Sequence, residues 1–473
     1  MEKFFKLKAN GTTVRIEVIA GITTFLTMAY IIALNPNLLT GFDTGSKLWN
    51  AVFLATCLAS ALGTFVMAFY ANKPFAMAPG MGINTFFAII VANIVTLTGS
   101  SYVQSFQAAL CIILIEGVIF LLLSVFNIRE KIAQAIPRSI RFGISPAIGL
   151  MLINIGLGSN AGVYDADGNV YYVMKDFFGA LTPKILMKSM GGSYPMMVIT
   201  VLTMFIGLFA IIIMAHKRIT GSVLWGMLIA SGFYWLMEAL VVGVNPFASL
   251  ANANFIPPFG DMISTTFFKF DFVTLSKIGW LSMIAIIITY CIIDMFDTIG
   301  ALIGTASRAK MVDKDGNVEN MKEALTSDAV GTIAGAVCGT STVTTYIESA
   351  AGIESGGRTG LTAVTTGIMF LLSMFLAPIV AVIPAAATSA ALIYVGILMF
   401  APIKNLNLHD LTQVAPVVIM LIAMPISGSI GHGIGLGIIS YTVLCIFTGR
   451  RKEVSLFTFI IAALFLLKFF LPI

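Results

Sequence analysis

Acidic side chains inside strongly apolar stretches are the residues of this sequence whose types and positions could do chemistry. A carboxylate at the centre of a membrane helix costs about 2.5–3.5 kcal/mol or more, so each one needs a functional or pairing explanation. Carboxylates held in such surroundings can accept hydrogen bonds and carry protons. Five acids lie within apolar runs: Glu116, Glu238, Asp294, Asp297 and Glu348.

Asp294 and Asp297 are three residues apart, so they share one face of a helix. Joint ionisation of two close carboxylates is unfavourable, and these spans contain no Lys or Arg that would neutralise them. A proton is therefore the expected counter-charge. The alternative is that one Asp only hydrogen-bonds an interrupted segment. Glu116 and Glu238 are solitary, and packing or hydration of a helix end is the preferred account of both.

The side chains near these acids indicate what a site could bind. Asn84 offers a donor and an acceptor, and aromatic rings provide flat apolar faces. A planar heteroaromatic molecule with donors on one edge and acceptors on another fits this set, whereas three carboxylates would repel an inorganic anion. Aromatic residues make up 11% of the chain, so any single ring can equally belong to the core or face lipid. The rings in question are Phe86, Phe87, Phe296 and Tyr346.

Two segments that carry these residues are not expected to form continuous helices. Residues 78–87 (APGMGINTFF) combine a proline, two glycines and an asparagine within an apolar run, and residues 344–358 are short, hydroxyl-rich and acidic. Interrupted segments at matching positions of two halves are typical of a transporter binding site near the bilayer midplane. Their free N–H groups can donate to a ligand. The simpler alternative is a kinked pair of tightly packed helices.

The composition requires that these segments sit in a membrane protein. Of the 473 residues, 58% are hydrophobic and only 10% charged, against about 25% charged in soluble domains, which excludes a soluble enzyme and a disordered chain. At about 20 apolar residues per span, we expect an all-α polytopic protein with fourteen transmembrane segments. The expected spans are 16–39, 49–70, 80–97, 104–126, 141–158, 196–215, 219–243, 278–303, 325–341, 345–357, 361–383, 388–403, 413–427 and 430–448.

Seven spans in each half would place the halves in opposite orientations, as two inverted repeats. Weak sequence echoes agree with this, since Pro137 precedes Gly149 by the same interval at which Pro384 precedes Gly396. A cytoplasmic N-terminus puts most of the 27 lysines and arginines inside, as the positive-inside rule requires. The apolar tail 454–471 could cross again, lie in the interface or pack against the bundle.

Three motifs identify a family that the sequence resembles. The stretches APGMGINTFF (78–87), DMFDTIGALIG (294–304) and TSTVTTYIESAAGIESGGRTGLTA (340–363) closely resemble the AzgA-type purine permeases of the nucleobase–cation symporter group, which includes nucleobase–ascorbate transporters. The stretches 22–36 and 424–441 resemble that family too, so the likeness spans nearly the whole chain.

The resemblance implies a division into a core domain of spans 1–4 and 8–11 and a gate domain of spans 5–7 and 12–14. The corresponding residues are 1–127 and 277–384 for the core, and 128–276 and 385–473 for the gate. It also implies short extended stretches in spans 3 and 10, and proton-coupled uptake of guanine, hypoxanthine or adenine by movement of core against gate.

Residue roles follow from the same resemblance. Asp294 and Glu348 would bind the purine ring with help from Asn84, while Asp297 and Gly82 would support transport. The acids Asp294, Asp297 and Glu348 are the candidates for proton coupling. The remaining residues of the expected binding set are Phe87, Phe296, Thr345, Tyr346 and Ser349.

Other readings of the sequence remain open. A transporter of the same fold could carry xanthine, uracil or an anion, although acidic Glu348 argues against the anion. An intramembrane aspartyl protease is disfavoured because it needs two aspartates on different helices, whereas Asp294 and Asp297 share one. A channel is disfavoured because the sequence shows no repeated ring of carbonyls or charges. We therefore expect no enzyme, no cofactor, no metal site and no nucleic-acid partner. The expected partners are a purine base, protons and membrane lipid, in a multi-pass protein of the cytoplasmic membrane; a homodimer is compatible with the sequence.

Overall fold

The computed structural model describes residues 2–41, 43–126, 137–158, 172–180, 182–189, 194–251, 253–308 and 320–470. The expected domain boundary at residues 127 and 128 and the last residue of the tail 454–471 lie outside this part of the chain. Within it, helices dominate and one short antiparallel strand pair lies among them.

The first half of the chain forms helices that match its expected spans. Its elements are α1 (Glu2–Phe5), α2 (Val14–Met28), α3 (Ile31–Leu39), α4 (Lys47–Val66), the π-helix η1 (Met67–Ala71), β1 (Met77–Pro79), α5 (Met81–Thr98), α6 (Tyr102–Val125), α8 (Arg138–Gly156), the π-helix η3 (Val173–Phe177), α9 (Pro183–Ser189), α10 (Tyr194–His216), α11 (Ser222–Met237), the π-helix η4 (Glu238–Val242), the 3₁₀ helix η5 (Ala248–Leu250), α12 (Phe259–Thr265) and α13 (Phe272–Ser276).

The second half also forms helices on its expected apolar runs, with a short strand at the tenth. Its elements are α14 (Trp280–Arg308), α15 (Met321–Cys338), β2 (Val343–Thr345), α16 (Ser349–Glu354), α17 (Gly360–Ser373), the 3₁₀ helix η6 (Met374–Leu376), α18 (Ala377–Ala381), α19 (Ala385–Leu398), the 3₁₀ helix η7 (Ala401–Asn405), α20 (Leu411–Ser427), α21 (Ile430–Phe447), the 3₁₀ helix η8 (Arg451–Glu453) and α22 (Leu456–Phe470).

Ten helices of the described residues are long and apolar enough to cross a membrane, by length and composition. The chain is therefore an integral membrane protein with a mainly helical fold. The shorter apolar helices Trp280–Met295, Leu411–Ser427 and Leu456–Leu467 fall on the remaining apolar runs. The count of fourteen spans and the inverted repeats stay predictions.

Local hydrogen bonds explain where several spans begin and end. Ser101 accepts from the Gln104 N–H, and the Gln104 side chain accepts from the Ser101 N–H, a capping box that starts α6. Ser46 caps α4 in the same way through the Trp49 N–H. Gly339 ends α15 with a φ of +102°, which a residue with a side chain adopts only under strain.

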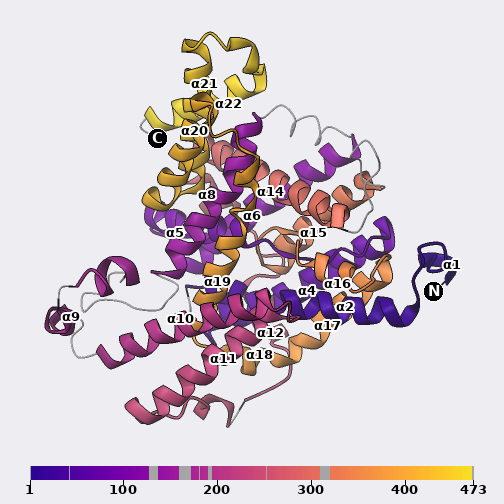
Figure 1. The fold of residues 1–473 in the computed structure, drawn as a ribbon, viewed down its shortest axis with the longest axis vertical. Coiled ribbons are helices and arrows are strands. Elements are labelled where there is room, and N and C mark those ends of the chain that lie inside the picture. Colours follow the sequence, from indigo (N-terminus) through magenta and orange to yellow (C-terminus); the bar gives the residue numbers. More distant parts are fainter. Residues whose placement is uncertain are drawn as a thin grey trace.

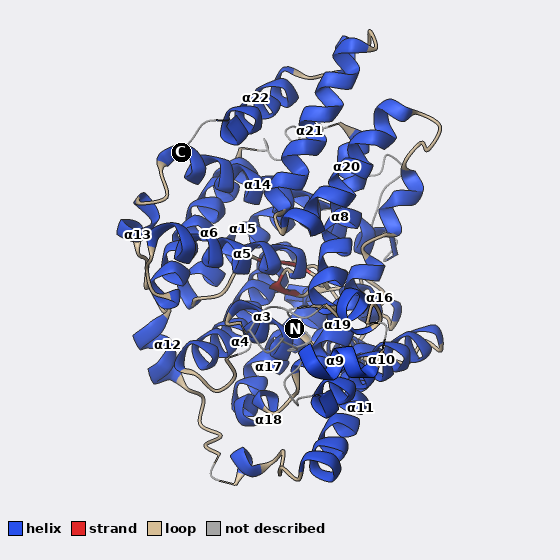
Figure 2. Cartoon of the chain, turned by 90° about the vertical axis from the view of Figure 1, so that its left-hand side faces the viewer, coloured by secondary structure: helices blue, strands red, loops and turns tan. Residues whose placement is uncertain are grey.

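The two interrupted segments pair with each other as short strands. In β1 and β2, Met77 lies opposite Thr345, Ala78 opposite Thr344 and Pro79 opposite Val343. Both strands are fully buried near the centre of the molecule, where Figure 2 shows them in red. The expectation of short extended stretches at the third and tenth apolar runs is confirmed, although the strands lie at or just before the starts of the expected spans 80–97 and 345–357. Pro79 and Gly80 interrupt the helix at β1, β2 contains neither residue type, and backbone groups of the two strands bond across the pair.

The helices pack in two groups. α8, α19, α10, α11, α20 and α21 pack successively on one another, and in Figure 1 they extend from α20 and α21 at the top to α10 and α11 at the bottom. A second group consists of α2, α3, α4, α6, α15, α16 and α17. The tail helix α22 packs on α21 and α14, which favours the third of its expected placements.

The glycines of the sequence echo meet where α8 crosses α19. A Cβ added at Gly149 would lie 2.5 Å from the carbonyl oxygen of Gly396, and one added at Gly396 would lie 2.6 Å from that of Gly149. Pro137 and Pro384 precede these two helices at their N-caps. The crossing therefore depends on glycine at both positions, because any side chain would push the backbones apart.

Residues outside the spans fasten α20 to the end of α21. The Asp410 side chain caps α20 and accepts from Arg450 at 2.6 Å. Hydrogen bonds from Thr412 and Arg450 lower the pKa of Asp410 to about 2, so this carboxylate stays ionised at neutral pH. The two ends of the α20–α21 hairpin thus lie together.

Candidate functional site

Asp328 on α15 anchors the strand pair. Its Oδ1 accepts from the hydroxyl of Thr344 at 3.0 Å and from the N–H of Thr345 at 3.2 Å. It is fully buried, and the sequence analysis missed it. The signal was present, because Asp328 lies at the start of the expected span 325–341 and carries the same cost as the other buried acids.

Thr298 on α14 joins Asp328 to Asp294. Its Oγ1 lies 3.1 Å from Asp294 Oδ1, 2.9 Å from Asp328 Oδ2 and 2.7 Å from the Thr344 hydroxyl. Asp294, Thr298, Asp328 and Thr344 are all buried, and we refer to these four residues as the Asp–Thr cluster. It brings two carboxylates from different helices to one hydroxyl beside β2.

Glu348 follows β2 by three residues, at the N-cap of α16. Its Oε1 accepts from the Tyr30 hydroxyl at 2.8 Å, and its backbone carbonyl accepts from Thr27 at 3.4 Å. Tyr30 belongs to the short break between α2 and α3, so the first span orients the acid. No sequence pattern pointed to Tyr30, which is far from Glu348 along the chain.

Asn84 and Tyr346 fasten the strand pair to its surroundings. The Asn84 Oδ1 accepts from the Ser341 hydroxyl, and its Nδ2 donates to the Pro79 carbonyl at 3.2 Å. The Tyr346 hydroxyl donates to the same carbonyl at 2.6 Å. These contacts give both side chains a supporting position around β1, and their expected contact with a substrate stays a prediction.

Two hydroxyls of the second interrupted segment differ in their contacts. The Ser349 hydroxyl accepts from the Ala76 N–H at 2.9 Å. The Thr345 hydroxyl is buried and has no hydrogen-bond partner within the described part of the chain. A buried unpaired hydroxyl is costly, so Thr345 is the member of the expected set with an open bonding position.

The aromatic residues of the expected set lie in different surroundings. Phe87 is completely buried and packs edge-to-face on Phe106 at 4.9 Å, inside the contact of α5 with α6. Phe86 packs on Tyr290 of α14, with ring centroids 4.7 Å apart. The Phe296 side chain lies outside the described residues.

Asp297 and Gly82 lie at opposite sides of the start of α5. The Asp297 Oδ2 is 3.3 Å from the position of a Cβ on Gly80, the residue before α5. A Cβ on Gly82 would lie 2.9 Å from Ile148 of α8 and 3.7 Å from Met399. The helix start therefore faces Asp297 and also touches the other helix group. The first N–H groups of α5 have no acceptor within the helix and can donate to a bound molecule.

Glu116, which has no second acid near it in the sequence, hydrogen-bonds a residue next to the strand pair. Glu116 is buried on α6, and its Oε2 accepts from the Thr342 hydroxyl at 2.8 Å, just before β2. Glu17 on α2 is a further acid that the sequence analysis missed. It is completely buried and accepts from the backbone N–H groups of Arg358, Thr359 and Thr362, which hold the start of α17 against α2.

The arrangement can bind a polar planar molecule and hold protons. Carboxylates from α14, α15 and the N-cap of α16 surround a strand pair, with N–H donors at the start of α5. Among the described residues, no three His, Cys, Asp or Glu side chains are grouped as metal ligands would be.

Comparisons with known proteins show the family to which the chain is related. A profile of the Permease family matches residues 15–440. The chain is 38% identical over 470 residues to the adenine permease AdeP of Escherichia coli (strain K12), covering 99% of this chain and 95% of that protein. It is 35% identical over 475 residues to the guanine/hypoxanthine permease PbuO of Bacillus subtilis (strain 168), covering 99% of this chain and 100% of that protein.

A solved structure shares the fold. The transmembrane domain of a cyanobacterial bicarbonate transporter, BicA, superposes with a TM-score of 0.60, covering 89% of this chain and 97% of that one. The sequence identity is 14%, so this likeness concerns the fold alone.

Proposed function

The chain belongs to the Permease family, and from that membership we propose that it imports purine nucleobases together with protons across the cytoplasmic membrane. It is an integral membrane permease and not an enzyme. The observation that carries the proposal is the match, over nearly the whole chain, to permeases named for adenine and for guanine and hypoxanthine. The proposed substrates are therefore guanine, hypoxanthine, adenine or several of these.

The carboxylates around the strand pair support a nitrogen heterocycle as substrate. An ionised carboxylate only accepts hydrogen bonds, and the ring and exocyclic N–H groups of a purine only donate. We assign base binding to Asp294, which reaches β2 through Thr298 and Thr344, and to Glu348, which follows β2 at the N-cap of α16. Thr345 can bond the base through its open hydroxyl, and Asn84 and Tyr346 hold the backbone around it.

A count of hydrogens supports proton coupling. The Asp–Thr cluster contains four close oxygen–oxygen contacts, of 3.1, 2.9, 2.7 and 3.0 Å. Each contact needs one hydrogen, and the hydroxyls of Thr298 and Thr344 supply only two. With both carboxylates ionised, some of these contacts would set lone pair against lone pair. A proton on Asp294 or Asp328 supplies a third hydrogen, which relieves part of that repulsion and reduces the buried negative charge.

The packing of the helices supports the proposed movement. The core domain (1–127 and 277–384) contains the second helix group described above, and the gate domain (128–276 and 385–473) contains the first. Gly82 touches Ile148 and Met399 across their boundary. Movement of one domain past the other would open the strand pair to either side of the membrane in turn.

The proposed orientation has a cytoplasmic N-terminus. The ends of the first, seventh and eleventh expected spans line one pocket together, as they must if all three cross in the same direction. The basic cluster at residues 450–452 would then lie on the cytoplasmic side, in line with the positive-inside rule.

Uptake into bacterial cells without their own purine carriers tests the substrate class. We expect cells that make this protein to take up radiolabelled adenine, guanine or hypoxanthine, and a protonophore to abolish accumulation. Unlabelled purines should compete, while uracil and bicarbonate should not. Cells with the protein in the membrane but without purine uptake would contradict the proposal. Competition by uracil alone would favour a carrier of another nucleobase with the same fold.

A further inference from the structure

A second polar pocket lies apart from the strand pair, where the ends of several helices meet. It has a volume of about 270 Å³ and is lined by Asn37 at the end of α3, Tyr234, Trp235 and Glu238 near the end of α11, and the α18–α19 connection around Pro384. None of these residues belongs to the site described above. We call it the outer pocket.

Asn37 presents a buried donor at this pocket. Its Oδ1 accepts from the indole Nε1 of Trp49 at 2.7 Å, and because an indole N–H only donates, this bond fixes which way the amide points. The Nδ2 is buried and has no hydrogen-bond partner within the described residues, although Asn37 is only 1% exposed. Such a group needs an acceptor, which a water or a bound molecule in the pocket can supply.

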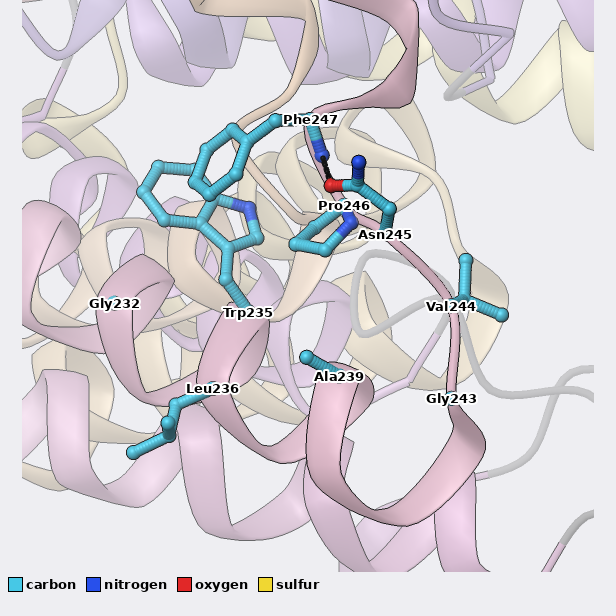
Figure 3. A pocket seen from close by; sticks show the side chains of 9 residues that line it. All are labelled: Gly232, Trp235, Leu236, Ala239, Gly243, Val244, Asn245, Pro246 and Phe247. Carbon is cyan, nitrogen blue, oxygen red and sulfur yellow. Dashed lines mark hydrogen bonds between the residues drawn. The ribbon is translucent and has the colours of Figure 1, made fainter.

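Trp235 forms a fixed aromatic wall of the same pocket. Its indole N–H donates to the Val382 carbonyl at 3.0 Å, which ties α11 to the α18–α19 connection. Phe247 packs edge-to-face on the Trp235 ring at 4.9 Å. Figure 3 shows this pair in an adjoining groove that the end of α11, η4 and residues 243–247 line, together with the bond from the Phe247 N–H to Asn245 that holds the loop. The ring therefore separates that groove from the outer pocket.

Glu238 completes the chemistry with a charged acceptor. It is half-buried in η4, and the residues that line the pocket with it include no Lys or Arg. The set consists of a donor from Asn37, an acceptor from Glu238 and flat faces from Trp235 and Tyr234. A molecule that fits must be planar and carry both an N–H group and a bare ring nitrogen or carbonyl oxygen.

We propose that the outer pocket is a second binding site for the purine base that the protein carries. The pocket is smaller than the roughly 300–1,000 Å³ of sites for drug-sized ligands, so it suits a bare base and not a nucleoside. This inference rests on the proposed function. In the proposed orientation the pocket opens to the outside, between helices of the core (α3, α18) and of the gate (α11, α19), so it holds the base before the base reaches the strand pair.

Equilibrium binding of radiolabelled adenine, guanine and hypoxanthine to the purified full-length protein tests the inference. We expect two bases per chain for the wild type and one, in the outer pocket, for Glu348→Gln. The double variant Glu348→Gln/Glu238→Gln should bind at least about tenfold more weakly than Glu348→Gln, the effect of losing a hydrogen bond to a charged group. Combining Glu348→Gln with Asn37→Asp, which keeps the Trp49 bond but replaces the donor, should have the same result.

The matched control is Asn245→Asp in the Glu348→Gln background, because Asn245 lines the adjoining groove and not the outer pocket; it should leave binding unchanged. Thermal unfolding of each variant establishes that it is folded. One base per chain in the wild type and none in Glu348→Gln would overturn the second site and leave the proposed function intact. No binding of any base to the wild type would overturn both.

Discussion

Replacing Glu348 with glutamine is expected to reduce concentrative purine uptake at least about 100-fold. The substitution keeps the size of the side chain, and its amide oxygen can still accept from the Tyr30 hydroxyl, which lies 2.8 Å from Oε1. The second carboxylate oxygen is replaced by a donor, which faces the N–H groups of a base with the wrong polarity. A hydrogen bond to a charged group contributes about 1.5–3 kcal/mol, and the mismatch adds the cost of an unpaired donor.

Initial uptake rates and binding by purified protein measure this effect. Glu354→Gln is the matched control, because Glu354 is exposed at the other end of α16; its uptake should stay within about twofold of the wild type, as expected of a surface position. If Glu348→Gln took up bases against a gradient as the wild type does, Glu348 would neither bind the base nor carry the proton.

Asp328→Ala is expected to abolish uptake and to destabilise the protein by several kcal/mol. Asp328 accepts from Thr298, Thr344 and the Thr345 N–H, and removing it takes away the acceptor of that N–H and one acceptor of each hydroxyl. Each unpaired buried group costs about 1–3 kcal/mol. The loss frees β2 from α15, so the strand pair is no longer held in place.

Asp328→Asn separates the structural role of Asp328 from its role in proton coupling. The Asn carbonyl can accept from Thr344 and Thr345, and its amide can donate to Thr298, as a protonated Asp328 would. We expect this variant to fold and to bind bases, with accumulation that responds about tenfold less to a pH gradient. Thr326→Ala is the control, because that hydroxyl bonds only within its own helix, to Lys322. Full gradient-driven accumulation by Asp328→Asn would contradict the proposal that a proton on the Asp–Thr cluster couples uptake to the pH gradient.

The resemblance to purine permeases is confirmed, and so are the two interrupted segments. Both were readable because they depend on local sequence. Pro79 and Gly80 interrupt the helix within residues 78–87, the hydroxyl-rich start of residues 344–358 belongs to β2, and the apolar runs limit where helices can lie. The three motifs cover the strand pair and the middle of α14, which is the part of the chain that forms the site.

The partners of the acids could not be read from the sequence. Asp294 and Asp297 were expected to act on each other through one helical face, whereas the contacts of Asp294 run through Thr298 to Asp328 on another helix. Glu116 and Thr342, and Tyr30 and Glu348, are likewise brought together by tertiary packing alone. Such pairings depend on how helices cross, which no local pattern specifies.

The number of spans is also difficult to derive from hydropathy. α15 is not among the helices that are apolar enough to qualify, yet it packs between α4 and α6 and buries Asp328. A helix that is surrounded by protein needs small residues for close contact more than it needs apolar ones. Hydropathy therefore misses α15, although it identifies the largely buried span Lys47–Ala71.

Accumulation of radiolabelled base by purified protein in sealed lipid vesicles is the most direct test of proton-coupled purine transport. Adenine, guanine and hypoxanthine would each be presented at equal concentration on both sides of the vesicle membrane, with a pH gradient imposed and no other carrier present. We expect the base to accumulate in the more alkaline compartment and the accumulation to collapse when a protonophore is added. Vesicles with Glu348→Gln should show no accumulation. Accumulation that follows a sodium gradient and ignores the pH gradient would contradict proton coupling. Failure of every purine to enter the vesicles would contradict purine transport itself.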